Sequence, residues 1–414
     1  MTKKSDAPAI RFKGFSDAWE QRKLGDMMNV TSVKRIHQSD WTDSGVRFLR
    51  ARDIVAAAKN EEPDDYLYIS KEKYEEYSTL SGKVGVSDLL VTGVGTIGVP
   101  YLVRNLEPLY FKDGNIIWFQ NSDKIDGKFL FYSFSAEQIQ GFINESAGIG
   151  TVGTYTIESG KKTPISLPNQ IEQAKVGEFF QQLDNLITLH QRKFEKLTNV
   201  KKSMLEKMFP QNGSSYPEIR FKGFADPWEQ RKLGDIADIV GGGTPSTGNQ
   251  SYWDGDIDWY APAEIADQIY ANSSQKKITG LGYENSSAKM LPPGTVLFTS
   301  RAGIGKTAIL TRKGCTNQGF QSIVPHRGEL DSYFIFSRTG ELKRYGELVG
   351  AGSTFVEVSG KQMAVMELMM PPTMREQQTI GGFFQQLDHL ITLHQRELEK
   401  LQNIKKSMLE KMFV

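Results

Sequence analysis

The chain has 414 residues and a formal net charge of +1, and its 39% hydrophobic and 24% charged residues are typical of a globular protein of about two domains. The near-neutral charge excludes a protein that is basic over its whole surface, so any nucleic acid would be bound by local patches or with partners. One cysteine, Cys315, excludes an internal disulfide, and no signal-peptide pattern or bilayer-length apolar stretch is present, so we expect a cytoplasmic protein without membrane contact.

A short segment near the start of the chain returns in its second half. Residues 10–26 read IRFKGFSDAWEQRKLGD, and residues 219–235 read IRFKGFADPWEQRKLGD. The aromatic residues of this segment predict an anchor that packs against the rest of the protein. Because the two copies are almost identical, the anchor cannot carry what differs between the halves. Residues 1–9, before the first copy, have the composition of a disordered tail.

The first insert, roughly residues 27–168, predicts a mixture of strands and helix. Its strand candidates are residues 46–54, 89–92 and 115–119, and a helix is expected over residues 128–140. These elements do not alternate regularly, so an α+β fold is predicted rather than a parallel βαβ sheet.

Three arginines, Arg47, Arg50 and Arg52, lie in the first of these predicted strands. Successive side chains of a strand face opposite ways, so Arg50 and Arg52 would share a face that could meet a base edge or a phosphate. The alternative is that they form surface or intradomain ion pairs.

A second, longer repeat dominates the sequence. Residues 179–210 and 383–414 are identical at 26 of 32 positions. Their apolar residues recur in alternating steps of three and four, which predicts a helix of coiled-coil type, roughly 60 Å long at ~1.5 Å per residue. A helix of this length needs a partner, and the obvious partner is its own duplicate. The predicted seam consists of Phe180, Leu183, Ile187, His190, Phe194 and Leu197 in the first copy, and of Phe384, Leu387, Ile391, His394, Leu398 and Leu401 in the second.

Polar residues interrupt the seam at matching positions of the two copies. His190 and His394 are interpreted as polar register markers rather than as ligands or bases. Lys201 and Lys405 fill two further gaps in charged segments, which indicates a solvated face or, alternatively, contact with a nucleic-acid backbone or a partner subunit. Each helix is expected to begin with a capping box.

Two glycine-rich loops suggest nucleotide binding but lack its context. Residues 93–98 fit the dinucleotide pattern GxGxxG, and residues 300–307 resemble a phosphate-binding P-loop. Neither loop opens the helix whose N-terminus would hold a phosphate. The loops also align with each other, with Thr92 at the position of Thr299, so a strand–loop–strand turn shared by the two inserts is the simpler interpretation. The five histidines and one cysteine predict no metal site.

Polar residues in and near these loops are of the types that contact DNA. Arginine and lysine bind phosphates and guanine, whereas asparagine and glutamine suit adenine, although such amides more often satisfy backbone groups. The candidates are Arg47, Arg50 and Arg52 with Thr92 in the first insert, and Thr299, Arg301, Lys306, Asn317, Gln318 and Gln321 in the second insert, roughly residues 236–372.

The order of anchor, insert and long helix, repeated once, resembles the specificity (S, HsdS) subunit of type I restriction-modification systems over essentially the whole chain. The first insert lacks the Gly-Thr-Pro motif that the second has. The most specific matches are Gly242-Gly243-Thr244-Pro245, Tyr252-Trp253, Ile257-Asp258-Trp259, the stretch from Ser300 to Lys306, Asn317-Gln318-Gly319-Phe320, and Pro371-Pro372 with Glu376-Gln377.

The resemblance implies a first target-recognition domain over residues 1–168, a central long helix over 169–210 and a linker over 211–218. A second recognition domain over 219–372 and a C-terminal helix over 373–414 follow. Each domain would read one half of a bipartite double-stranded DNA target. The helices would pair antiparallel as a coiled coil with a pseudo-twofold repeat and would set the spacing of the half-sites.

By the same resemblance, the chain has no catalytic centre and binds no cofactor or metal itself. It would hold two methyltransferase subunits, which methylate adenine with S-adenosylmethionine, and would join restriction subunits that use ATP and Mg. Two alternatives remain open: a nucleotide-dependent enzyme that uses a glycine-rich loop, and a coiled-coil scaffold that does not bind DNA.

Overall fold

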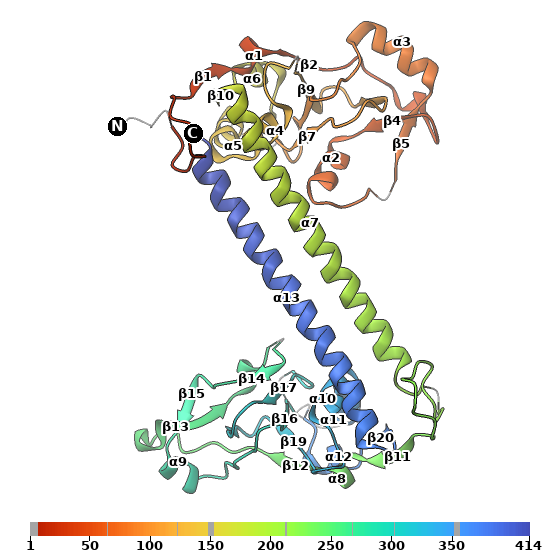
Figure 1. Cartoon of the computed structure of the whole chain (residues 1–414), viewed down its shortest axis with the longest axis vertical. Helices are drawn as coiled ribbons and strands as arrows, with labels where there is room; N and C mark the ends of the chain where they lie inside the picture. Colours follow the sequence, from red (N-terminus) through yellow and green to blue (C-terminus); the bar gives the residue numbers. More distant parts are fainter. Residues whose placement is uncertain are drawn as a thin grey trace. The chain divides into compact units, whose positions relative to one another are not determined.

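The computed structural model describes residues 7–63, 65–121, 123–147, 153–211, 213–266, 268–301, 303–351 and 357–414. The chain forms two compact units, Met1–Arg192 with Gln395–Val414, and Lys193–His394 (Figure 1). Each unit thus contains one insert and parts of both long helices. Residues 1–6 of the expected tail, Asn212 of the expected linker and Ala302 of the second glycine-rich loop lie outside the described residues.

The first insert is built on two four-stranded sheets. One has the order β2-β9-β6-β7 and is antiparallel throughout, and the other has the order β3-β5-β4-β8 with one parallel pair, β4 and β8. The strands are β2 (Asn29–Thr31), β3 (Trp41–Thr42), β4 (Val46–Leu49), β5 (Leu67–Ile69), β6 (Leu89–Thr92), β7 (Pro100–Leu102), β8 (Leu109–Phe111) and β9 (Ile116–Gln120).

Two consecutive helices replace the single helix expected over residues 128–140. Helix α4 (Gly127–Ser135) ends and α5 (Glu137–Ser146) begins at Ala136, whose extended backbone (φ −80°, ψ 150°) interrupts the helical turn. The Asp126 carboxylate caps α4 by accepting a hydrogen bond from the Phe129 amide at 2.9 Å. The other helices of this insert are α1 (Leu24–Met27), α2 (Ala51–Ala58), α3 (Lys71–Ser81) and α6 (Ile157–Lys162).

The second insert has a five-stranded sheet of order β12-β19-β16-β17-β14 and a three-stranded sheet of order β15-β13-β18. Its strands are β12 (Ala237–Gly241), β13 (Trp253–Tyr260), β14 (Tyr270–Ala271), β15 (Lys276–Ile278), β16 (Val296–Phe298), β17 (Thr307–Leu310), β18 (Cys315–Thr316) and β19 (Gln321–Pro325). Its helices are α8 (Leu233–Ile236), α9 (Gly280–Glu284), α10 (Ser332–Ser337), α11 (Thr339–Gly350) and α12 (Gly360–Ala364).

The two inserts share the pairing of their central strands, although their sheets differ in strand number and their sequences are not visibly similar. In the first, β4 runs antiparallel to β5 and parallel to β8; in the second, β13 has the same relation to β15 and β18. Likewise, β9 lies between β2 and β6, and β19 lies between β12 and β16. The predicted α+β fold is therefore confirmed, and the strand pairing shows which loops of the two inserts correspond.

Each anchor adds a strand to the end of its insert. β1 (Glu20–Lys23) pairs antiparallel with β10 (Pro164–Leu167), and β11 (Glu229–Lys232) pairs in the same way with β20 (Glu367–Met370). The insert chain thus returns to the anchor just before its long helix begins, so nearly identical anchors and helices hold different inserts.

A buried ion pair also ties each anchor to the first turn of its helix. Arg11 donates two hydrogen bonds to Glu172, at 2.6 and 2.7 Å, and Arg220 donates two to Glu376, at 2.7 and 2.9 Å. Both carboxylates are essentially inaccessible to solvent. A negative charge is favourable in the first turn because the helix dipole is positive there.

The long helices are α7 (Gln170–Lys207) and α13 (Met374–Met412), drawn in green and blue in Figure 1. In the first unit, Lys405 of α13 pairs with Asp184 of α7 at 2.6 Å, and the Phe413 ring lies 5.7 Å from the Phe180 ring. The partners descend along α13 as they ascend along α7, so the helices run antiparallel there. Neither these helices nor any other in the described chain is long and apolar enough to cross a membrane.

The second unit shows the same pairing with the helices exchanged. Lys201 of α7 pairs with Asp388 of α13 at 2.5 Å, and Phe209 stacks on Phe384 with ring centroids 6.0 Å apart. The core of each insert is therefore completed by the end of the helix that follows the other insert. Phe209, for example, packs with Trp228 and Phe334.

The predicted seam residues are all buried or half-buried. Those nearest the inserts are buried: Phe180, Leu183, Ile187, Phe384 and Leu387. The remaining seam residues are half-buried: His190, Phe194, Leu197, Ile391, His394, Leu398 and Leu401. Within each unit, the seam is therefore buried where the insert packs on it and partly open to solvent elsewhere.

Candidate nucleic-acid interface

The two glycine-rich loops form the same tight turn. The Thr92 hydroxyl donates to the Thr96 carbonyl at 2.5 Å and accepts from the Val99 amide at 2.9 Å. The Thr299 hydroxyl donates to the Gly303 carbonyl at 2.8 Å and accepts from the Lys306 amide at 2.9 Å. The predicted strand–loop–strand turn is confirmed.

This geometry removes both threonines from the candidate DNA contacts. Thr92 and Thr299 are fully buried, and both bonds of each hydroxyl lie inside its own turn. A strand, not a helix, follows each turn, β7 in one insert and β17 in the other. The phosphate-binding interpretations therefore lose the helix N-terminus on which they depend.

In the second insert, three of the sequence candidates, Arg301, Asn317 and Gln318, lie around one surface. Gln318 accepts a hydrogen bond from the Thr244 hydroxyl. The side-chain oxygen of Asn317 accepts from the Gly319 amide at 2.8 Å. A Cβ at Gly319 would lie 3.5 Å from the Arg301 Nε atom, so the loop of Arg301 and the loop of residues 317–319 are in contact. Three separate segments thus present polar side chains together.

The Gly-Gly-Thr-Pro motif explains how Thr244 reaches this surface. A Cβ at Gly242 would lie only 2.0 Å from the Asn317 carbonyl oxygen, so only glycine allows this approach. The Gly243 amide donates to the Thr316 carbonyl at 2.8 Å, and its carbonyl accepts from the Trp259 indole at 2.8 Å. The motif is a packing device that carries Thr244 to Gln318.

The remaining candidates of the second insert differ in accessibility. Lys306 and Gln318 are exposed, whereas Arg301, Asn317 and Gln321 are half-buried. The backbone of Arg301 forms an isolated antiparallel bridge with that of Glu357, and no ion pair joins the Arg301 guanidinium to a carboxylate of the described residues. Gln321 packs beside Gly360, where a Cβ would lie 2.9 Å from its side-chain oxygen, and this side chain is committed to the fold.

In the first insert, the prediction that Arg50 and Arg52 share a strand face is wrong. Strand β4 ends at Leu49, and Arg50 is the N-cap of α2. Its amide donates to the Asp53 carboxylate at 2.8 Å, a capping box that starts the helix and that the strand interpretation overlooked. The equivalent position after β13 has the same device, since the Ala261 amide donates to Glu264 at 3.0 Å.

The arginines of this stretch are engaged inside the insert. Arg50 pairs with Asp53 and Asp65 at 2.8 and 2.9 Å, and Arg52 pairs with Asp65 at 2.6 Å. The hydrogen bond from Arg50 lowers the pKa of the Asp65 carboxyl. The Arg47 guanidinium lies 3.6 Å from the centroid of a tyrosine ring, that of Tyr66. The structure thus contains the intradomain ion pairs of the alternative interpretation for Arg50 and Arg52.

Strand equivalence identifies basic residues that the sequence did not single out. The Lys112 amide donates to the carbonyl of Leu49 at 2.9 Å, just as the Asn317 amide donates to that of Tyr260 at 3.0 Å. Lys112 thus occupies the place of Asn317. The loop between β2 and β3, which matches the Gly-Gly-Thr-Pro segment, exposes Lys34 and Arg35. Only the strand pairing reveals this correspondence, because the two loops have no residue pattern in common.

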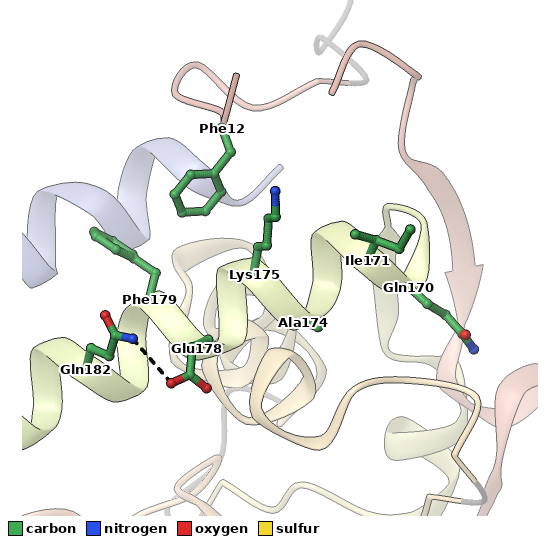
Figure 2. Close-up of a pocket in the computed structure, with 8 residues that line it drawn as sticks. All are labelled: Phe12, Gln170, Ile171, Ala174, Lys175, Glu178, Phe179 and Gln182. Carbon is green, nitrogen blue, oxygen red and sulfur yellow. Dashed lines mark hydrogen bonds between the residues drawn. The ribbon is translucent and has the colours of Figure 1, made fainter. Parts of the chain in front are cut away.

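A groove at the start of α7 lacks the features of a catalytic site. Figure 2 shows its lining: Phe12, Gln170, Ile171, Ala174, Lys175, Glu178, Phe179 and Gln182. The Phe12 and Phe179 rings meet edge to face at 5.8 Å, and Glu178 pairs with Lys128 at 2.7 Å. The groove is an apolar junction between anchor and helix with ordinary surface charges.

Neither a metal-binding cluster nor a reactive cysteine is found among the described residues. No group of three or more histidine, cysteine or acidic side chains in the described residues is arranged to hold a metal. Burial raises the pKa of the Cys315 thiol to about 11, so this cysteine is not a nucleophile at neutral pH. The polar surface around Gln318 and Arg301 remains as the candidate site of the second insert, with Lys34, Arg35 and Lys112 as its counterpart in the first.

Comparison with known proteins decides the family. A model described as the type I restriction modification DNA specificity domain matches the chain twice, over residues 16–199 and 225–403. The chain belongs to this family. Each matched region contains one whole insert and most of the frame around it, where the frame is the anchor and the long helix, so the internal repeat of the sequence is a repeat of this domain.

Relatives agree with this membership. The MjaIX specificity subunit of Methanocaldococcus jannaschii is 34% identical over 190 residues, which span 45% of this chain and 44% of that protein. The putative MjaX specificity subunit of the same organism is 25% identical over 407 residues, or 94% of this chain and 92% of that protein. A crystal structure of the S subunit from M. genitalium has the same fold, with a TM-score of 0.63, 13% identity and 99% of both chains covered.

Proposed function

We propose that the chain is the DNA-specificity subunit of a type I restriction-modification complex and that each insert reads one half of a bipartite target. The observation that carries this proposal is one duplicated frame that holds two inserts with the same central strand pairings and different loop residues. The shared pairing presents corresponding loops in the same way, and unlike side chains on those loops favour unlike half-sites. The recognition domains would occupy residues 1–168 and 219–372, and the helices residues 169–210 and 373–414.

The loop chemistry suits DNA. The Thr244 hydroxyl binds the side-chain oxygen of Gln318, which leaves the amide NH2 group of this exposed residue to donate to a base edge. Arg301 has the charge and donors for a guanine or a phosphate, and Lys306 for a phosphate. In the first insert, Lys34 and Arg35 provide positive charge on the matching loop.

Arg301 offers a direct test of this surface. We expect Arg301→Ala to weaken binding of target DNA by the assembled complex by about 1–3 kcal/mol if it reads a base. If it contacts a phosphate, binding would weaken uniformly across sequences. The slope of the logarithm of the binding constant against the logarithm of the salt concentration would then fall by about one. Fluorescence anisotropy across a salt series measures both, with Arg35→Ala as the matched variant in the first insert. Unchanged affinity would remove Arg301 from the interface.

Replacing one insert by a copy of the other tests whether each insert reads its own half-site. Residues 27–168 are replaced by a second copy of residues 236–372, and the methylated motif is determined by sequencing the host genome. We expect a motif with two copies of the half-site that the second insert reads. If the motif keeps both original half-sites, the inserts are not the parts that read DNA.

The helices are proposed to set the distance between half-sites. A helix rises ~1.5 Å per residue and DNA ~3.4 Å per base pair, so seven residues added to each helix correspond to about three base pairs. Seven residues also preserve the seam, because the apolar pattern repeats with that period. We therefore expect such insertions after Arg192 and before Gln395 to lengthen the spacer and to leave the half-sites unchanged.

The partners are proposed to be two methyltransferase subunits and restriction subunits, which would supply S-adenosylmethionine, ATP and Mg chemistry that this chain lacks. Support for two copies of one partner comes from the frame surface. Leu186 and Leu189 of α7 are 44% and 45% exposed, and Leu390 and Leu393 of α13 are 40% and 43% exposed. These leucines occupy matching positions of the repeat, so a partner that recognises one pair would recognise the other.

A further inference from the structure

One carboxylate on each long helix makes two different connections. In the first unit, Asp184 of α7 accepts a hydrogen bond from the Tyr132 hydroxyl of α4 at 2.7 Å and pairs with Lys405 of α13 at 2.6 Å. The Lys405 ammonium also lies 5.6 Å from the centroid of the Tyr132 ring. We call these three residues the first lock. It joins an insert, its own helix and the opposite helix.

The second unit contains the same arrangement, which we call the second lock. Asp388 of α13 accepts from the Tyr333 hydroxyl of α10 at 2.9 Å and pairs with Lys201 of α7 at 2.5 Å. The Asp388 side chain is only 8% exposed. Both tyrosines are buried, and they come from helices of inserts that have no visible sequence similarity. The same connection therefore recurs in two different inserts.

The positions of these charges favour one alignment of the helices. Asp184 and Asp388 occupy the same position of the repeat, and so do Lys201 and Lys405. A parallel, in-register pair would bring each charge close to its like. A slip of one heptad in an antiparallel pair would carry Lys405 away from Asp184 by ~10 Å. Lysine at an apolar seam is unfavourable without a partner, so only the observed alignment satisfies both lysines.

The apolar seam alone discriminates much less between alternative alignments of the two helices. Its leucines, isoleucines and methionines would pack against one another after a shift of seven residues, because they repeat with that period. The aromatic residues at the helix ends, Phe209 and Phe413, contribute burial but carry no charge that penalises another alignment. A polar pair at a seam position is the established physical means of specifying register in coiled coils.

We propose that the two locks are the positioning residues that fix the register of α7 against α13 and the seat of each insert on them. This inference rests on the proposed function, since register matters there because it sets the spacing of the half-sites. The lysines fix the register by pairing with the carboxylates of the opposite helix. The tyrosines of the inserts donate to the same carboxylates, so the position of each insert is tied to that register. The earlier interpretation of Lys201 and Lys405 as solvated or partner-binding residues is thereby replaced.

The test uses the whole chain with its partner subunits in a host whose genome is then sequenced for methylation. The register variant combines Asp184→Asn and Lys405→Met with Asp388→Asn and Lys201→Met. Asparagine still accepts from each tyrosine, and methionine fills the seam, so the helices keep their packing while losing both charged pairs. The control variant carries Lys202→Met and Lys406→Met, which alter the neighbouring exposed lysines.

We expect the register variant to methylate the same half-sites but to accept spacers that the wild type rejects. Methylation at those spacers should rise by about tenfold, the ratio expected for a coupling in the middle of the range measured within one ion-pair network. The control should keep a single spacer. The inference is overturned if the register variant accumulates, methylates its half-sites and keeps one spacer as strictly as the control.

Two further results separate the possibilities. If the four-fold variant does not accumulate, Asp184→Asn with Lys405→Met leaves the second lock intact and is scored in the same way. If the wild type itself shows no gapped motif, the proposed function fails and the locks lose their purpose. If the wild type shows one and both lock variants keep its spacer, only the positioning role fails.

Discussion

The ion pair that ties each anchor to its helix predicts an asymmetry between the two units. Among the described residues, Glu172 receives two side-chain hydrogen bonds, both from Arg11. Glu376 receives two from Arg220 and a third from the Trp228 indole at 3.2 Å. The equivalent indole in the first unit, that of Trp19, is buried without a hydrogen-bond partner in the described chain. We call the pair of Arg11 and Glu172 the first clamp and the pair of Arg220 and Glu376 the second clamp. The two clamps are matched except for the hydrogen bond from the Trp228 indole.

The magnitudes follow from burial. Removing one member of a buried pair costs about 3–5 kcal/mol because the other charge is left unpaired. Glu172→Met and Glu376→Met should both fall in this range, and Glu376→Met should cost a further ~1–3 kcal/mol because it also leaves the Trp228 indole unsatisfied. Removing both partners, as in Arg220→Met with Glu376→Met, should recover much of the loss because no unpaired charge remains.

Hydrogen exchange read by mass spectrometry measures these costs separately in each unit. Peptides from β11 and β20 report on the second clamp, and peptides from β1 and β10 report on the first. For each clamp, a double-mutant cycle compares the wild type with the arginine variant, the glutamate variant and the double variant. The reasoning is refuted if the double variants open as easily as the glutamate variants, or if Glu172→Met and Glu376→Met cost the same.

Two further predictions concern the second unit. Burial disfavours the charge of Asp258, but the Ser274 amide, Arg312 and Lys277 outweigh it and hold its pKa at about 2, below the ordinary value of 3.8. Its stabilisation, about 2 kcal/mol, is therefore present above pH 3.8 and lost as the pH falls toward 2; the difference in unfolding free energy between wild type and Asp258→Asn should shrink over that interval, and a constant difference would contradict it. Phe209→Ala, at a side chain only 6% exposed, should destabilise the second unit by about 3–5 kcal/mol. The half-buried Phe413→Ala should cost less and should destabilise the first unit. If hydrogen exchange became faster in the same unit for both variants, this packing would be excluded.

The anchors and long helices could be predicted from the sequence because each occurs in two nearly identical copies. The seam, the caps and the anchor could be read from identity and spacing, and the match of Thr92 with Thr299 from a few shared residues in the loops. These features are local, so their residue patterns suffice. The extension of the strand past Leu49 was wrong because a capping box of four residues, from Arg50 to Asp53, outweighed the apolar pattern that suggested a strand.

What the sequence did not reveal depends on contacts between distant segments. The shared topology of the inserts lies in strand pairing, and strands such as β4 and β13 pair alike with unlike residues. The partners of Lys201 and Lys405 lie on another helix, so their spacing in the sequence could not distinguish a solvated face from an ion pair. The surface around Gln318 likewise forms only when three segments meet.

The most direct test of the account compares the methylated genome of a host with and without this gene, in the presence of the proposed methyltransferase partner. The account predicts that a methylated adenine motif appears with the gene and that it consists of two unlike half-sites separated by a spacer of fixed length. No gene-dependent motif, or a single uninterrupted one, would contradict the claim that two inserts on one repeated frame read a bipartite target.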